Sequence, residues 1–252
     1  MTTNLSFFLL LLLFSLLLLS CNSGPKEIPL SLDAKTITHR GHSYDVVTID
    51  DPQSIHFFWK DASNKRYKSL GNLKTALAAK NKKLTFAMNG GMYLKDGSPQ
   101  GLYIEKNHQL AKTDTVQKAY GNFYLQPNGI FYIGDSTAQV LTTVDYLQGQ
   151  TEAKYATQSG PMLVINGQLH TAFRENSTST HFRNGVGVRA DGKIVFAISN
   201  EQINFYNFAT LFKEKLDCPN ALYLDGFVSR AYIPDLGRED VDGNFGVIIG
   251  VL

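Results

Sequence analysis

The chain has 252 residues, of which 43% are hydrophobic, 12% aromatic and 18% charged, and its formal net charge at pH 7 is +2. This composition can build a sizeable apolar core without crosslinks. The small net charge and the lack of a prominent Lys or Arg run argue against a nucleic acid as the partner.

An apolar segment from Leu5 to Leu19 opens the chain and leads into Ser20-Cys21. Its end resembles the lipobox of bacterial lipoproteins, in which a peptidase cuts before the cysteine and the cysteine carries the lipid. We therefore expect residues 1–20 to be a lipoprotein signal peptide, followed by a tether over 21–35. The segment departs from usual signals because no Lys or Arg precedes it. An uncleaved anchor is the alternative, although about 15 apolar residues are fewer than the roughly 20 that span a bilayer. The expected location is the bacterial cell envelope, with the chain held at the membrane through Cys21 and facing the periplasm or the exterior.

Residues 36–252 have a length that fits one domain, and strand patterns dominate it. Alternating or continuous apolar runs between turn residues predict strands at 44–49, 55–59, 84–88, 102–104, 123–125 and 130–133. Turn sequences further predict three hairpins, which join 122–126 to 130–133, 162–165 to 168–169, and 186–188 to 194–198.

Two helices are predicted from apolar residues at helical spacing, at 70–80 and at 205–216. Each leads into a strand, and each of these strands ends in a polar turn, at Asn89 and at Asp225. In mixed and parallel sheets such strand ends converge on one crevice where ligands bind. We therefore expect an α+β fold, namely a β-rich mixed sheet with several hairpins and a few helices, and we expect Asn89 and Asp225 to share a pocket.

The cysteines and histidines give no sign of a metal site or a disulfide. Cys21 and Cys218 are the two cysteines, and Cys218 is expected to be a buried, apolar side chain rather than a nucleophile. The six histidines follow no metal-ligand spacing. No metal and no other cofactor is expected.

Four glycine-rich polar segments stand against apolar runs and are the candidate site. Glycine lets backbone approach a ligand closely, while Asn, Arg, Asp and Ser supply donors and one anionic acceptor. The alternative is that these residues only turn the chain: Asp225 would cap a turn, Arg183 would pair with Asp191 or Glu201, and Asn89 would hold its own turn. The segments are Asn89-Gly90-Gly91 with Gly97-Ser98-Pro99-Gln100-Gly101, Gln158-Ser159-Gly160-Pro161, Arg183-Asn184-Gly185-Val186-Gly187, and Leu224-Asp225-Gly226-Phe227-Val228-Ser229.

From about Leu84 onward, the order of these motifs resembles that of the phosphodiester glycosidase family. The resemblance implies hydrolysis of a sugar-1-phosphodiester at the anomeric carbon. It departs from the family pattern after Asp225-Gly226, where this chain has Phe227 and Val228 in place of two further glycines.

The implied chemistry assigns roles to the motif residues. Breaking the C1–O bond releases a phosphate monoester, whose second pKa is roughly 6 and which leaves without a strong acid. Arg183 is the candidate cation for the phosphate, with Arg230 as a second possibility; Asp225 is the candidate nucleophile or base, and Asn89 would orient the sugar or water. Backbone and hydroxyl groups would bind the substrate, and these candidates are Gly90, Gly91, Ser159, Gly160, Gly226 and Ser229.

A second carboxylate is not assigned by the motifs, although Asp96 and Glu105 lie near the first of them. Two functions follow from these residues. The first is a hydrolase acting on a phosphodiester-linked sugar in an envelope or extracellular glycan. The second is a lipid-anchored module that binds anionic or phosphorylated glycans without turnover. The expected partners are a carbohydrate or sugar phosphate and the membrane, with no nucleic acid.

Overall fold

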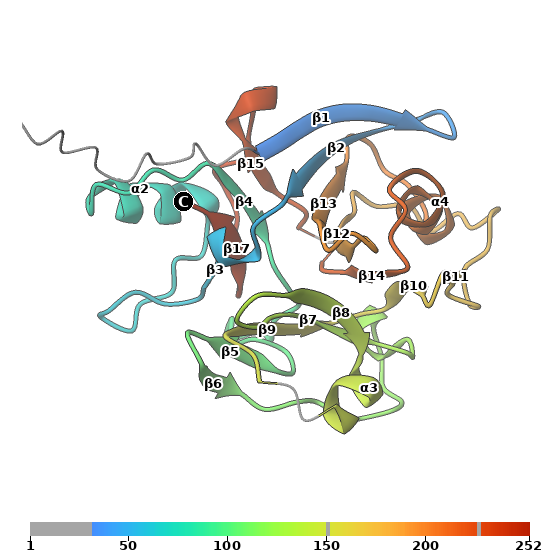
Figure 1. Ribbon diagram of the computed structural model, residues 1–252, viewed down its shortest axis with the longest axis horizontal. Helices are drawn as coiled ribbons and strands as arrows, with labels where there is room; N and C mark the ends of the chain where they lie inside the picture. Colours follow the sequence, from blue (N-terminus) through green and yellow to red (C-terminus); the bar gives the residue numbers. More distant parts are fainter. Residues whose placement is uncertain (1–31, 150–151, 226–227) are drawn as a thin grey trace, which may run out of the picture. The chain divides into compact units, whose positions relative to one another are not determined.

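The computed structural model describes residues 32–149, 152–225 and 228–252 (Figure 1). The expected signal peptide, Cys21, most of the expected tether and Gly226 lie outside the described residues. Strand β1 begins at Leu32, so the last residues of the range expected for the tether are strand. Among the described residues, no helix combines the length and the apolar character needed to cross a bilayer.

The described strands form three antiparallel sheets, and residues 31–252 form one compact unit. The first sheet has seven strands, in the order β1 (Leu32–His39), β2 (His42–Ile49), β13 (Ile194–Ser199), β12 (Asn184–Val188), β14 (Asn220–Tyr223), β10 (Met162–Ile165) and β11 (Gln168–Leu169). The second has β16 (Arg238–Glu239), β15 (Ala231–Ile233), β4 (Phe86–Asn89), β17 (Ile248–Val251) and β3 (Ile55–Phe58). The third has β6 (His108–Ala111), β5 (Tyr103–Glu105), β9 (Tyr155–Ser159), β7 (Gly129–Ile133) and β8 (Ala138–Thr142).

All three sheets contribute to one central core, and strand β13 shows how. Successive side chains of a strand point to opposite faces. Ile194, Phe196 and Ile198 therefore belong to the central cluster, where they pack with residues of the other two sheets. Val195 and Ala197 point the other way and pack with helix α4 (Phe205–Thr210). Strand β13 is apolar on both faces because both of its faces are covered.

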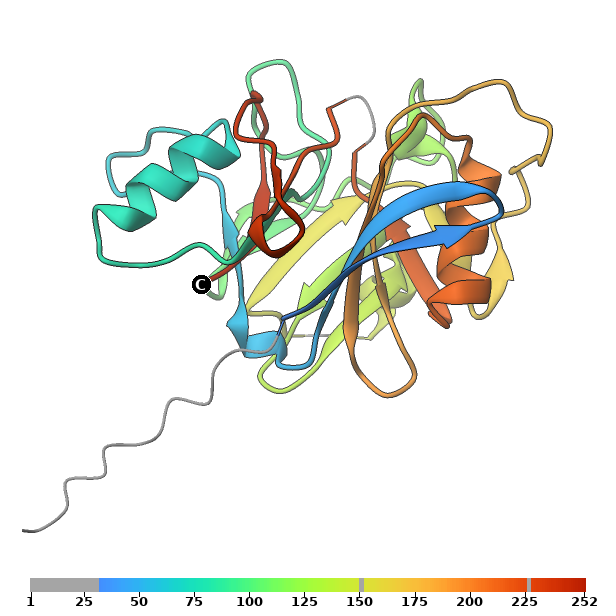
Figure 2. The same cartoon turned by 90° about the horizontal axis from the view of Figure 1, so that it is seen from above.

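The helices cover outer faces of the sheets (Figure 2). Helix α2 (Leu70–Ala78) begins after Ser69, whose Oγ accepts the N–H of Asn72 at 3.1 Å, and buries three leucines against the second sheet. Helix α4 (Phe205–Thr210) continues as a π-helical turn, η3 (Leu211–Lys215), and covers the first sheet. The short elements are α3 (Thr143–Gln148) and the 3₁₀ turns η1 (Pro52–Ser54), η2 (Asn122–Tyr124) and η4 (Pro234–Leu236).

The predicted fold class is confirmed: the domain is β-rich, with short helices and antiparallel hairpins. The hairpins at 162–169 and 186–198 form as predicted. The hairpin through Asn128 does not, because residues 122–124 form η2 and β7 pairs with β8 and β9 instead. All described strand pairs are antiparallel, so the parallel pairing considered for the two helix-to-strand units does not occur.

Candidate functional site

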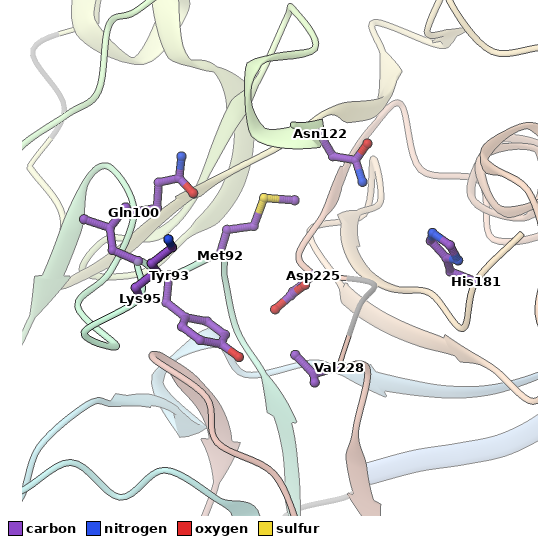
Figure 3. Close-up of a pocket in the computed structure, with 9 residues that line it drawn as sticks. Met92, Tyr93, Lys95, Gln100, Asn122, His181, Asp225 and Val228 are labelled. Carbon is purple, nitrogen blue, oxygen red and sulfur yellow. The ribbon is translucent and has the colours of Figure 1, made fainter. Parts of the chain in front are cut away.

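A pocket with a volume of about 420 Å³ opens where loops from all three sheets meet (Figure 3). The segment after β4 contributes one wall, η2 contributes a second, and the segments before β12 and after β14 close the other side. The described residues that line it are Met92, Tyr93, Leu94, Lys95, Gln100, Asn122, His181, Asp225 and Val228.

Asp225 follows β14 and is the one carboxylate among these described lining residues. Its carboxylate lies in the pocket close to Tyr93 and Val228 (Figure 3), while the residue as a whole is only 8% exposed. Burial raises the pKa of the Tyr93 hydroxyl, and the negative charge of Asp225 raises this pKa further. The pocket therefore places an anionic oxygen beside a phenol that stays protonated at neutral pH.

The backbone around Asp225 is held by buried side chains. Asn184, on β12, accepts the N–H of Asp225 at its Oδ1, at 3.0 Å. The Oγ of Ser229 donates to the carbonyl oxygen of Asp225 at 2.8 Å, and the Oγ of Ser159 donates to that of Leu224 at 2.6 Å. Both serines are buried, and neither lines the pocket. Their hydroxyl groups thus hold the backbone that bears the Asp225 carboxylate, on the side away from the pocket.

Asn89, at the end of β4, lies behind the pocket and is fully buried. Its Oδ1 accepts from the Nδ2 of Asn184 at 2.8 Å and from the backbone N–H of Arg230 at 2.9 Å. Its own Nδ2 is buried without a hydrogen-bond partner among the described residues. Asn89 and Asp225 therefore lie in one region, joined through Asn184, but Asp225 lines the pocket and Asn89 does not, which differs from the expectation that the two share it.

The two glycines after Asn89 allow close packing. A Cβ on Gly90 would lie 2.5 Å from Cγ1 of Ile249, and a Cβ on Gly91 would lie 2.5 Å from Oγ1 of Thr157. Gly160 is equally confined, since its Cβ would lie 2.8 Å from the Cβ of Asn128. None of these glycines lines the pocket. They let the chain pass tightly between strands, so that the residues after Gly91 can form a pocket wall.

Arg183 does not line the pocket, which corrects its expected position beside the phosphate. The side chain is fully buried; its guanidinium donates to the carbonyl oxygens of Ile203 at 2.8 Å and Ser179 at 3.0 Å, and to the hydroxyl of Tyr223 at 3.3 Å. It also stacks on Phe205, with 3.6 Å from Cζ to the ring centroid. Burial lowers the pKa of Arg183, but guanidinium groups keep their proton in proteins.

The other charged candidates also lie elsewhere. The Arg230 guanidinium binds the carboxylate of Asp242, with its Nε 2.7 Å from Oδ1. Asp96 accepts from Ser98 within its own turn, and Glu105 accepts from the hydroxyl of Tyr103 beside a different cavity. Neither Asp96 nor Glu105 supplies this pocket with a second carboxylate.

Several lining residues were not identified from the sequence. Tyr93 lies between the two parts of the first glycine-rich segment, and His181 lies two residues before Arg183, so both are close in sequence to candidate residues. Gln100 lies within the first glycine-rich segment but had been given no role, and Asn122 reaches the pocket from a loop whose path depends on tertiary contacts. Lys95 and His181 are the described lining residues that bear or can bear positive charge. The described part of the chain holds no group of three or more His, Cys, Asp or Glu placed to bind a metal ion.

Comparisons with known proteins agree with this fold. A sequence model of the phosphodiester glycosidase family matches residues 82–246. An uncharacterised protein of Escherichia coli (strain K12), YigE, is 34% identical over 206 residues, which are 81% of this chain and 77% of YigE.

Solved structures with low sequence identity share the fold. The zebrafish N-acetylglucosamine-1-phosphodiester alpha-N-acetylglucosaminidase catalytic domain, auto-inhibited by its pro-peptide, matches with a TM-score of 0.62 and 16% identity, over 90% of this chain and 85% of that one. A Synechocystis protein matches with a TM-score of 0.55 and 12% identity, over 87% of this chain and 61% of that one. Since the family model spans more than half of the chain, the protein belongs to the phosphodiester glycosidase family.

Proposed function

We propose that the protein hydrolyses a sugar-1-phosphodiester, breaking the bond between the anomeric carbon and the phosphate oxygen. The observation that carries this proposal is Asp225, a carboxylate in the pocket whose backbone is held by Asn184 and Ser229. Membership of the phosphodiester glycosidase family supports it, and Asp225 lies within residues 82–246, which the family model matches.

In this proposal Asp225 acts on the sugar side of the bond. The transition state of such a hydrolysis resembles an oxocarbenium ion, which a nearby carboxylate stabilises as nucleophile or as base for water. Tyr93 lies beside this carboxylate, and its raised pKa keeps its hydroxyl available as a hydrogen-bond donor. Gln100 and Asn122 line the same pocket with amide groups that suit the hydroxyl groups of a sugar.

The phosphate side needs positive charge rather than a strong acid. The leaving phosphate monoester has a second pKa of roughly 6, so it departs as a stable anion. Lys95 and His181 line the pocket and are the groups we assign to it. Arg183 has a positioning role in this scheme, since its guanidinium holds Ser179, close in the chain to His181, while it remains buried.

We further propose that the substrate belongs to an envelope or extracellular glycan and that the protein is lipid-anchored through Cys21. This part rests on the apolar segment that ends at Cys21. Metabolic labelling with a fatty-acid analogue, comparing the natural chain with Cys21→Ser, tests the anchor. Equal labelling of the two chains would contradict it.

The activity is tested with the purified chain, UDP-N-acetylglucosamine and a GlcNAc-1-phospho-6-mannoside, by measuring free sugar. Asp225→Asn should lower kcat by about 10²–10⁴-fold, the usual contribution of a catalytic acid or base, while substrate binding is retained. Asp96→Asn is the matched control, because that carboxylate is exposed and bonded within its own turn.

The same experiment distinguishes catalysis from binding alone. If the natural chain binds both compounds and a panel of envelope phosphodiesters but releases sugar from none, the protein is a binding module for anionic glycans. If Asp225→Asn hydrolyses its substrate at the natural rate, Asp225 does not carry the reaction.

A further inference from the structure

A second cavity, of about 580 Å³, lies beside β3, the end of α2, β5 and β9, and it shares no lining residue with the Asp225 pocket. Four lysines line it, Lys60, Lys80, Lys82 and Lys106, together with the acidic residues Asp61 and Glu105. Nothing in the proposed hydrolysis uses these groups.

The two acidic groups are already engaged by neighbours. Glu105 accepts the hydroxyl hydrogen of Tyr103 at 2.8 Å, and its other oxygen lies 3.4 Å from Nζ of Lys106. Oδ1 of Asp61 accepts two backbone N–H groups of its own loop. In contrast, Lys60, Lys80 and Lys82 form no ion pair with any residue that the structure describes. The cavity therefore keeps an excess of positive charge.

His56 lies at this cavity and responds to that charge. Its Nδ1 lies 3.1 Å from the hydroxyl oxygen of Tyr155. Burial lowers the pKa of His56, and the charges of Lys154, Lys82 and Lys106 lower it further. A bound anion would act in the opposite direction, since it would offset the positive charges around the imidazole.

Three of the four lysines, Lys60, Lys80 and Lys82, come from one basic stretch of the sequence, and Lys106 lies outside it. Residues 60–83 contain one acidic residue, Asp61, against eight basic residues: Lys60, Lys65, Arg66, Lys68, Lys74, Lys80, Lys82 and Lys83. The net charge of +2 conceals this concentration because the rest of the chain is acidic on balance. The folded chain thus has a local basic surface that its overall charge did not indicate.

Aromatic side chains form the apolar part of the same cavity. Phe58, Tyr67 and Tyr155 line it, and burial raises the pKa values of both tyrosines, so their phenols stay neutral. The apolar C–H face of a sugar ring can pack on an aromatic ring, and lysines attract a phosphate group. Carboxylate oxygens such as those of Glu105 can accept hydrogen bonds from sugar hydroxyls.

From the unpaired lysines and the aromatic walls, we propose that this cavity is a second binding site, which takes the ring and phosphate group of a phosphorylated sugar. It operates without Asp225 and performs no chemistry. The phosphate group recognised there can belong to a free sugar phosphate or to one unit of a phosphorylated glycan.

Calorimetric titration of the full chain with glucose 1-phosphate at low ionic strength tests the proposal. Binding should be saturable, should weaken as salt is added, and should exceed the affinity for glucose or inorganic phosphate alone. The double variant Lys80→Gln/Lys82→Gln should bind glucose 1-phosphate about tenfold more weakly. Each exposed lysine contributes only modestly to binding of the phosphate, and the variant removes two of them. Trp59, the single tryptophan, offers a fluorescence readout, since Nζ of Lys60 lies 3.9 Å from its ring centroid.

Two control variants separate this site from the other pocket. Lys213→Gln/Lys215→Gln removes the same charge from η3 and should leave the affinity unchanged. Lys95→Gln removes the lysine assigned to the phosphate in the Asp225 pocket and should retain glucose 1-phosphate binding at this second cavity, so failure of the hydrolase proposal would leave this result intact. Absence of binding, unchanged affinity in Lys80→Gln/Lys82→Gln, or loss of binding in Lys95→Gln would each overturn the proposal.

Discussion

The side-chain nitrogen of Asn184 donates to two oxygens of Asn89, to the backbone carbonyl at 2.9 Å and to Oδ1 at 2.8 Å. The Oδ1 of Asn184 meanwhile accepts the N–H of Asp225 at 3.0 Å. One buried amide therefore joins the end of β4 to the end of β14, although these strands belong to different sheets.

Asn184→Ala should both destabilise the protein and misplace Asp225. Buried oxygen and N–H groups left without partners cost about 1–3 kcal/mol in the free energy of unfolding, measurable by urea denaturation. The folded variant should also have a lower kcat, because the backbone N–H of Asp225 loses its hydrogen bond to Asn184. Asn184→Asp retains the shape but cannot donate to Asn89, so it should be at least as unstable. An unchanged kcat in folded Asn184→Ala would show that Asp225 is held without this amide.

Arg183→Lys should act mainly on stability. Lysine keeps the charge but cannot make the three separate hydrogen bonds or the flat stack on Phe205. We expect a loss of about 2–4 kcal/mol in the free energy of unfolding, and a smaller loss of kcat than in Asp225→Asn. If kcat falls as far as in Asp225→Asn while the unfolding curve is unchanged, Arg183 acts on the substrate after all.

Tyr93→Phe removes the hydroxyl beside Asp225 but little volume. Because the pKa of Tyr93 is raised, the phenol is neutral throughout the range from pH 6 to pH 9. The variant should therefore show a lower kcat, by about 10–100-fold, with the same shape of pH profile. This assignment would be contradicted if kcat of the natural protein fell at high pH while kcat of Tyr93→Phe did not.

His170 should make the protein less stable in acid. It is 3% exposed, and burial lowers its pKa below the ordinary 6.5, although a hydrogen bond to Gln126 raises it in part. Its Nδ1 accepts the N–H of Ala172, which requires the neutral ring. Below pH 6.5 the unfolded chain takes up a proton that the folded chain resists, so stability falls as the pH drops from 6.5 toward the folded pKa.

Urea unfolding between pH 5.5 and pH 7.5 measures this dependence. His170→Gln should lose less stability on acidification than the natural chain, whereas the exposed His108→Gln should lose as much as the natural chain. His39 and His56 also have lowered pKa values, so some acid sensitivity should remain in His170→Gln. If the free energy of unfolding falls equally with decreasing pH in His170→Gln and in the natural chain, His170 is excluded as a cause of the acid sensitivity.

The sequence predicted most of the helices and hairpins because their formation depends on residues that are close together in the chain. The leucines of α2 recur at helical spacing, and the turn at Asp191-Gly192 joins two strands whose side chains alternate. The segment 122–126 has the same apolar character as a strand, yet it forms η2. There Asn128 turns inward, and its Nδ2 donates to the carbonyl oxygen of Phe123 at 3.2 Å. The Oδ1 of Asn128 accepts the hydroxyl of Thr143 at 2.8 Å, and this contact with a later segment depends on the tertiary fold.

The candidate site was predictable in part for the same reason. Glycine-rich turns at strand ends pointed to Asn89 and Asp225, and the structure joins both through Asn184. Motif position alone could not show which way Arg183 faces, because Phe205 and Tyr223 draw its guanidinium inward from distant parts of the chain. His181 reaches the pocket because its backbone pairs with Ile203. Such contacts form only in the folded protein.

The walls of the Asp225 pocket come from segments that leave three separate sheets. No single sheet, and no pair of them, supplies all the described residues that line this pocket. Heating should therefore abolish turnover in the same cooperative step that melts the core, and a partly denatured intermediate with residual activity has no structural basis. Turnover would then serve as a sensitive assay for correct assembly of the whole domain.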